Sequence, residues 1–252
     1  MTLAFLVPAN LVLTARLVIL FKDGTTGGAA WAGKALFELA CLAALFRFSG
    51  VTVAAAAVLL AANVAGWWWE KRSSRKDLGR LALGLLTLTV LSICAAPAFG
   101  WSFRPALAGA SARLADWTVL APLATGVSGR SFQLALLGLL LAANEANLLI
   151  RAAFDWLNLK PQMRAATPGT MEVDFGEYNR GRIIGLLERA LIYFFVLNGQ
   201  FGVIGFALAA KAFTRFKELD DRRFAEYVLI GTLLSASLAV VTAAVVKWLL
   251  RP

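Results

Sequence analysis

Apolar stretches long enough to cross a lipid bilayer recur along this sequence. Four of them cover residues 28–46, 51–69, 131–150 and 226–249, and each has about the 20 residues that a helix needs to span the hydrocarbon core. Soluble domains are roughly 45–50% apolar, whereas 60% of this chain is hydrophobic and only 16% is charged. The sequence therefore predicts an all-α fold, a polytopic bundle of transmembrane helices that forms a single membrane domain over residues 1–252.

Three further apolar stretches raise the expected number of membrane segments to about six or seven. Residues 2–21 and 81–99 are two of them, and residues 183–210 are the third. The third is long enough to cross once, but its middle reads VLNGQFG, a sequence that favours a break. A straight crossing and a re-entrant hairpin both fit residues 183–210. The hairpin is favoured because it returns the charged segment 211–225 to the cytosol.

Positive charge is concentrated in the short segments between the apolar stretches. The chain has 25 Lys and Arg against 15 Asp and Glu, a formal net charge of +10. Cytoplasmic loops of membrane proteins are rich in Lys and Arg, so we expect residues 70–80, 151–182 and 211–225 to be cytosolic. Such a basic face also attracts anionic lipids, small anionic molecules or nucleotides.

Several residue types needed for common catalytic chemistry are missing. The chain contains no histidine, which is the commonest metal ligand and the commonest general base near neutral pH. Cys41 and Cys94 lie in separate apolar stretches, where cysteines usually pack as small core residues. The sequence has no Walker loop, dinucleotide fingerprint, nucleophile elbow or metal-ligand motif. We therefore expect a protein that is not an enzyme and that uses neither a metal nor another cofactor.

Polar side chains inside the apolar stretches are candidates for a conduit lining or for contacts between helices. Lys34 and Glu38 are four residues apart and so share one face of a helix. Asn144 and Asn147 begin a polar stripe on the stretch that ends at residue 150. Charged groups within the membrane face protein or water, and polar groups also hold helices together there. The predicted buried set comprises Lys34, Glu38, Asn144, Glu145, Asn147, Glu188, Asn198 and Gln200.

A second predicted set consists of basic side chains that would receive an anionic ligand on the cytosolic side. Glu188 follows a pair of glycines with small-xxx-small spacing, which lets another helix approach closely. We expect Glu188 to neutralise Arg151 or Arg182 across such a contact. The predicted ligand-binding set comprises Arg151, Arg182, Arg189, Lys211, Arg215, Lys217, Arg222 and Arg223.

Five short motifs lie between residues 181 and 237. They are GRxIGxLER at Gly181–Arg189, the GQ step at Gly199 and Gln200, IGFxLAAK ending at Lys211, RFKEL at Arg215–Leu219 and AEYxLIGTLLS at Ala225–Ser235. This pattern resembles the C-terminal part of an uncharacterised family of bacterial polytopic membrane proteins. The resemblance implies a multi-pass protein of the bacterial inner membrane. It also implies a structured unit containing Glu188, Arg189, Lys211, Arg215, Lys217 and Glu226.

Three functions fit these observations. The first is an oligomeric channel or pore that an anionic ligand gates at the basic cytosolic face, as in membrane effectors of bacterial defence systems. The second is a secondary transporter or lipid-handling protein that uses Lys34, Glu38, Glu145 and Glu188. The third is a membrane scaffold for partner proteins. An enzyme acting on lipid phosphates is the weakest alternative because it would have to work without metal or histidine.

Overall fold

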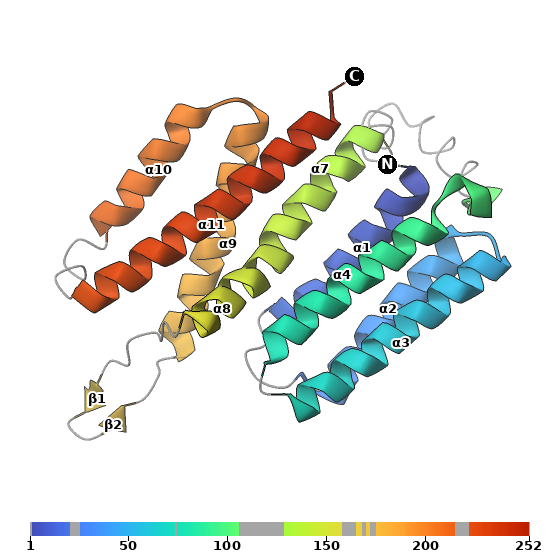
Figure 1. Cartoon of the computed structure of the whole chain (residues 1–252), viewed down its shortest axis with the longest axis horizontal. Helices are drawn as coiled ribbons and strands as arrows, with labels where there is room; N and C mark the ends of the chain where they lie inside the picture. Colours follow the sequence, from blue (N-terminus) through green and yellow to red (C-terminus); the bar gives the residue numbers. More distant parts are fainter. Residues whose placement is uncertain are drawn as a thin grey trace, which may run out of the picture. The chain divides into compact units, whose positions relative to one another are not determined.

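The chain forms helices that separate into two compact units (Figure 1). Unit 1 is Met1–Leu140 and unit 2 is Leu141–Pro252, and each is described by itself. The computed structural model describes residues 2–20, 26–73, 75–105, 129–157, 165–167, 170–171, 175–214 and 222–251. Nearly all regular structure in these ranges is helical, which confirms the predicted all-α class.

Unit 1 is built from five α-helices and one short 3₁₀ helix in its described part. They are α1 (Leu3–Leu20), α2 (Gly28–Leu45), α3 (Gly50–Arg72), α4 (Lys76–Cys94), the 3₁₀ helix η1 (Pro97–Phe99) and α7 (Arg130–Leu140). α3 packs between α2 and α4, and α1 packs against α2, α4 and α7. The helices α1, α2, α3 and α4 therefore surround a common space, and the site described below lies in it.

Local chemistry fixes both ends of α3. At its start the Ser49 side chain accepts a hydrogen bond from the Thr52 amide, which is the usual role of serine before the first turn of a helix. At its end the Trp69 indole Nε1 donates to the Arg75 carbonyl oxygen over 3.3 Å. α4 begins at Lys76, so this hydrogen bond ties the end of α3 to the start of α4.

The described part of unit 2 contains a π-helix, four α-helices and a small hairpin of two strands. They are η2 (the π-helix, Leu141–Glu145), α8 (Ala146–Trp156), β1 (Ala165–Thr167), β2 (Thr170–Met171), α9 (Phe175–Leu197), α10 (Phe201–Thr214) and α11 (Arg222–Leu249). β1 and β2 are antiparallel. α11 packs against α9 and α8, and α10 packs against α9.

The predicted break within residues 183–210 is confirmed. α9 ends at Leu197, and α10 begins at Phe201 after a turn in which Gly199 has φ +74°. Glycine adopts this left-handed conformation without the steric cost that a side chain would bring. The result is a helical hairpin, seen in Figure 1 as the two orange helices α9 and α10.

Among the described residues, five helices are long and apolar enough to cross a membrane, and the chain is accordingly a multi-pass membrane protein. They are Gly28–Leu45, Gly50–Arg72, Lys76–Cys94, Arg130–Trp156 and Ala225–Leu249. Two shorter apolar helices, Leu3–Ile19 and Phe201–Phe213, agree with the six or seven segments expected. Large apolar side chains such as Leu36, Leu60 and Leu86 are exposed on these helices. A hydrocarbon environment would cover such side chains at no cost.

Glycine allows α2 and α3 to approach closely. Trp31 in α2 is buried, and its ring lies so near Gly66 in α3 that a Cβ there would come within 2.5 Å of the Trp31 Cη2 atom. Around Gly50 at the start of the same helix, a Cβ would meet no atom within 4 Å. Gly66 is therefore a packing requirement.

We predict that Gly66→Ala lowers the stability of unit 1 by about 1–3 kcal/mol, the usual cost of overpacking a filled interior. Thermal unfolding in detergent, followed by circular dichroism, measures the change. Gly50→Ala is the matched control and should leave the unfolding temperature nearly unchanged. Equal unfolding temperatures for Gly66→Ala and the native chain would contradict the close contact between α2 and α3.

Candidate functional site

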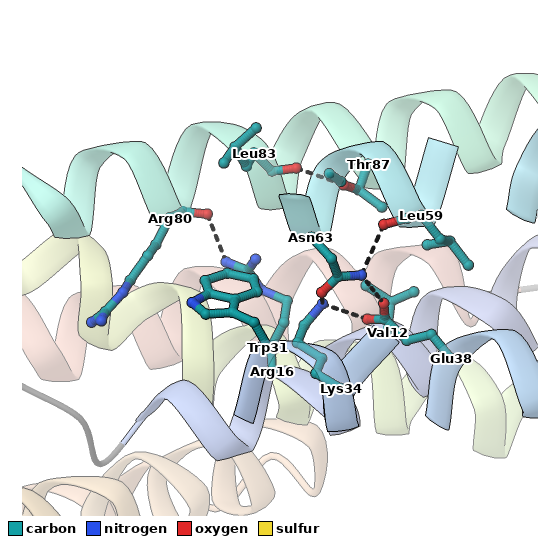
Figure 2. A pocket seen from close by; sticks show the side chains of 11 residues that line it. Val12, Arg16, Trp31, Lys34, Glu38, Leu59, Asn63, Arg80, Leu83 and Thr87 are labelled. Atoms are coloured by element: carbon teal, nitrogen blue, oxygen red, sulfur yellow. Dashed lines mark hydrogen bonds and ion pairs between the residues drawn. The ribbon is translucent and has the colours of Figure 1, made fainter. Parts of the chain in front are cut away.

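A small cavity lined by charged side chains lies among α1, α2, α3 and α4 (Figure 2). Its volume is about 10 Å³, which is about the space that one buried water needs. Apolar residues form part of the wall. The polar side chains of the wall are Arg16, Lys34, Glu38, Asn63, Arg80 and Thr87.

Lys34, Glu38 and Asn63 form a closed ring of hydrogen bonds on one side of this cavity. The Lys34 Nζ atom donates to Glu38 Oε1 over 2.6 Å and to Asn63 Oδ1 over 2.9 Å. The Asn63 Nδ2 atom donates to Glu38 Oε2 over 2.6 Å and to the Leu59 carbonyl oxygen over 2.8 Å. All three side chains of the ring are buried. The predicted pairing of Lys34 with Glu38 is confirmed, and Asn63 completes it.

Arg80 and Glu70 are the centre of a second group at the end of α3. The Arg80 Nε atom donates to Glu70 Oε1 over 2.7 Å, and its Nη1 atom lies 3.2 Å from Asp77 Oδ1. Glu70 Oε2 accepts from the Thr26 amide over 2.8 Å and from Trp31 Nε1 over 3.2 Å. Arg80 and Glu70 are each only 2% exposed. The carboxylate and the guanidinium are thus removed from water together.

Arg16 joins α1 to this group. Its Nη2 atom donates to the Arg80 carbonyl oxygen over 2.8 Å, and Figure 2 shows the guanidinium reaching α4 from below. The approach depends on Gly84, because a Cβ at that position would lie 2.6 Å from Arg16 Nη2. A buried arginine from the first apolar helix therefore reaches the wall of the cavity.

The charges around the cavity are balanced overall but unequal on its wall. Together the cluster holds three cationic side chains and three carboxylates, those of Arg16, Lys34, Arg80, Glu38, Glu70 and Asp77. The three cations all line the cavity, whereas Glu38 is the one carboxylate among the lining residues. The cavity wall is therefore positive, and the neutralising carboxylates Glu70 and Asp77 stand behind Arg80.

The cluster follows the length of α3 from its end towards its middle. Asn63 and Glu70 are two helical turns apart, or about 10 Å along the axis. The next two buried residues of α3 beyond Asn63 are apolar, because Leu59 is 2% exposed and Ala55 is 0% exposed, and the next buried polar residue is Thr52 in the first turn of the helix. The polar column therefore starts near the joint of α3 and α4, and it stops at an apolar layer about halfway along the helix.

The buried polar residues predicted in unit 2 lie at a π-helix. Asn144 and Glu145 are buried in η2, while Asn147 is half-buried in α8 with an Nδ2 atom that has no hydrogen-bond partner. Arg189 is 3% exposed, and its Nε atom donates to the Ala142 carbonyl oxygen over 2.9 Å. Its Nη1 atom lies 3.3 Å from Ser235 Oγ. A π-helix displaces carbonyl groups from the regular α-helical pattern, and Arg189 bonds one of them.

The ion pair at Glu188 differs from the expected one. Glu188 in α9 pairs with Lys211 in α10, whereas Arg151 or Arg182 had been expected in that role. The pair joins the two arms of the α9–α10 hairpin, so its physical effect is to hold the hairpin closed. Arg182 is buried and Arg151 is half-buried, and both have interactions of their own.

The remaining predicted residues are placed as follows. Asn198 and Gln200, expected among the buried polar groups, are both exposed at the hairpin turn. Asn198 Nδ2 donates to the Phe194 carbonyl oxygen over 2.8 Å and so caps α9. Arg215 and Lys217 lie outside the described residues. Arg222 and Arg223 begin α11, but their side chains are not among those described.

The sequence analysis missed five members of the unit 1 cluster, which are Arg16, Asn63, Glu70, Asp77 and Arg80. Glu70 and Arg80 were assigned to a cytosolic segment because basic residues surround them. One signal was available: Asn63 and Glu70 are seven residues apart and therefore lie on the same face of α3. Both could have been expected on the face that packs against the polar residues of α2.

No protein-family model, curated protein or solved structure matches this chain. Among the described residues, no group of three or more potential metal-binding side chains is found.

We predict that Arg80→Gln destabilises unit 1 by about 3–5 kcal/mol, because Glu70 would remain buried without its cation. Urea unfolding in mild detergent measures this loss. The exposed Arg75 is a matched control, and Arg75→Gln should have little effect on the free energy of unfolding. The double variant Glu70→Met/Arg80→Met should recover most of the lost stability, and a double variant as unstable as Arg80→Gln would contradict this account.

Proposed function

We propose that the protein transports a small inorganic or carboxylate anion across the membrane and that the anion enters the charged cavity of unit 1. The observation that carries the proposal is the cavity wall itself. The lining residues include Arg16, Lys34 and Arg80 with the single carboxylate of Glu38, and all four side chains are buried. The Arg16 and Lys34 cations face the other lining residues, whereas the Arg80 guanidinium points away from them and bonds Glu70 and Asp77 (Figure 2). A wall of this composition attracts anions.

The energetic cost of these buried charges supports a functional role for them. Moving an ion out of water costs several kcal/mol even after relaxation of the protein, and apolar residues of similar volume often replace a buried ion pair without loss of stability. Charged groups within membrane helices are accordingly rare, and they mark substrate or ion pathways. Helix packing alone would not require both Arg16 and Lys34 beside one space.

Lys34 is the cation best placed to receive the anion. Its ammonium group bonds to Glu38 and Asn63, and an entering anion can take the place of either oxygen. Asn63 can then keep Glu38 in position through its own bond to Glu38 Oε2. The polar column running from Glu70 to Asn63 gives the approach from the α3–α4 end, and the apolar layer at Leu59 blocks direct passage beyond it.

The closed geometry of the cavity favours the transporter over the ligand-gated pore. The polar groups bond to one another around a space of about 10 Å³, as expected for an occluded site that must rearrange to load and release its solute. A pore would instead conduct many ions per opening through a continuous aqueous path.

The orientation of unit 1 is part of the proposal. The α3–α4 joint carries Lys71, Arg72, Arg75 and Lys76, and the excess of Lys and Arg at this joint supports a cytosolic location. We place the protein in the bacterial inner membrane, with the polar column reached from the cytosol.

Uptake of anions into proteoliposomes tests the proposal. We predict that native protein takes up at least one anion from a panel of chloride, nitrate, formate, acetate and phosphate, with a rate that saturates with concentration. Lys34→Gln should reduce this uptake at least tenfold, because the anion would lose its charged ligand. Lys247→Gln is the matched control, since Lys247 is a half-buried lysine of α11 that donates to the Val196 carbonyl oxygen.

The alternatives give different results in the same assay. Non-saturating ionic currents that Lys34→Gln leaves intact would favour a pore elsewhere in the chain. Equal uptake by native protein and folded Lys34→Gln would refute the cavity as the transport site. A complete lack of flux, with Lys34→Gln altering only assembly, would favour a scaffold.

A further inference from the structure

Two tryptophans at the end of α3 each carry a cation on their ring. The Lys71 Nζ atom lies 3.9 Å from the centroid of the Trp67 ring, and the Arg72 Cζ atom lies 4.8 Å from that of Trp68. Lys71, Arg72 and the next basic residue, Arg75, are all exposed. Cation–π contact holds a charged group in place over the ring face, so two positive charges are held at one end of the helix.

Nothing in the described part of the chain neutralises these two cations. The nearest acidic residue in sequence is Glu70, but it points inward and bonds Arg80, Thr26 and Trp31. Among the described residues, no ion pair is formed by Lys71 or Arg72. Within the described part of the chain, the end of α3 therefore presents a positive surface that the negative charge of a ligand can neutralise.

Two of the three tryptophans at this end of α3, Trp67 and Trp69, pack against glycines of the neighbouring helices. A Cβ at Gly79 in α4 would lie 2.0 Å from Trp69 Nε1, and one at Gly28 in α2 would lie 3.4 Å from Trp67 Nε1. Trp69 also donates its indole hydrogen bond to the Arg75 carbonyl oxygen. The joint is thus a rigid platform built on three helices. A preformed site of this kind binds with less loss of conformational entropy.

The position of the platform points to the chemistry of its ligand. It lies where two candidate membrane helices, Gly50–Arg72 and Lys76–Cys94, meet at their ends. Tryptophan is enriched at the level of lipid headgroups, where its ring is half in hydrocarbon and its N–H group is near water. Trp68 is 50% exposed and Trp69 is 40% exposed, which leaves ring surface free for the glycerol and upper acyl region of a lipid.

From these observations we infer that the end of α3 binds the headgroup of an anionic phospholipid. Lys71 and Arg72 contact the phosphate, and Trp67 and Trp68 hold these cations from beneath while Trp68 packs along the glycerol backbone. The site lies on the outside of unit 1 and does not depend on the anion cavity. It gives the inner end of α3 a fixed depth in the leaflet that carries anionic lipid.

Native mass spectrometry of delipidated protein in neutral detergent tests this inference. The probes are phosphatidylglycerol and phosphatidylcholine with identical acyl chains, and soluble glycerol 3-phosphate serves as the competitor. The test variant is Lys71→Gln/Arg72→Gln. The control is Arg47→Gln/Arg251→Gln, which removes the same charge from two other exposed positions. Arg47 stands just before α3, at the opposite end of that helix from Lys71.

We expect the protein to bind phosphatidylglycerol with much higher affinity than phosphatidylcholine. Lys71→Gln/Arg72→Gln should weaken the binding of phosphatidylglycerol about 25-fold, because each basic residue at an anionic surface contributes roughly a factor of five. The control pair should keep native affinity, and Trp68→Leu, which retains both charges, should lose a few-fold. Circular dichroism shows whether each variant is folded.

Equal binding of the two lipids, or equal weakening by the control pair, would overturn the inference. Displacement of the lipid by glycerol 3-phosphate at comparable concentration would overturn the assignment to a lipid and indicate a site for free phosphate.

Discussion

The arrangement of unit 1 depends on the mutual neutralisation of charges that its helices bury. Arg80 is the largest of its fully buried side chains, and it is held by Glu70, Asp77 and Thr26. Neither Arg80 nor Glu70 could remain at its position without the other, because a lone buried charge is strongly unfavourable. The pair joins the end of α3 to the start of α4. Through Trp31 it also fixes α2, so one ion pair positions three helices.

Once that pair is in place, the rest of the cluster can be positive at low cost. Arg16 reaches the backbone of α4 where Gly84 leaves space, and Lys34 is balanced by Glu38 on its own helix. The result is a cluster that is neutral as a whole and cationic on its inner wall. An entering anion would thus meet cations that are already oriented, which reduces the reorganisation needed for binding.

In unit 2, different partners stabilise the charged side chains. Arg189 bonds backbone carbonyl groups of the π-helix and the Ser235 hydroxyl group. The more accessible Glu188 pairs with Lys211 across the α9–α10 hairpin. These contacts explain why charged residues occur in apolar helices of this unit. They secure a helix irregularity and a hairpin.

Much of the fold could be predicted from the sequence because hydrophobic length decides it. The lengths of the apolar stretches predicted most of the helices, and the sequence VLNGQFG predicted the turn between α9 and α10. The Lys34–Glu38 pair followed from helical spacing. The partners of Glu38 and Glu188 could not all be predicted, because some of them come from other helices. Asn63 in α3 donates a hydrogen bond to Glu38 in α2, and Lys211 in α10 forms an ion pair with Glu188 in α9. Glu70 and Arg80 were missed because a positive loop and a buried ion pair at a helix end look alike in sequence.

A crystal structure of the protein soaked in bromide, with anomalous scattering used to locate the ion, tests most directly whether the unit 1 cavity binds an anion. We expect a bromide peak in this cavity, in contact with Lys34 and beside Arg16, and no such peak in Lys34→Gln. Bromide found only at exposed cations, with the cavity of native protein free of it, would contradict an anion site in unit 1.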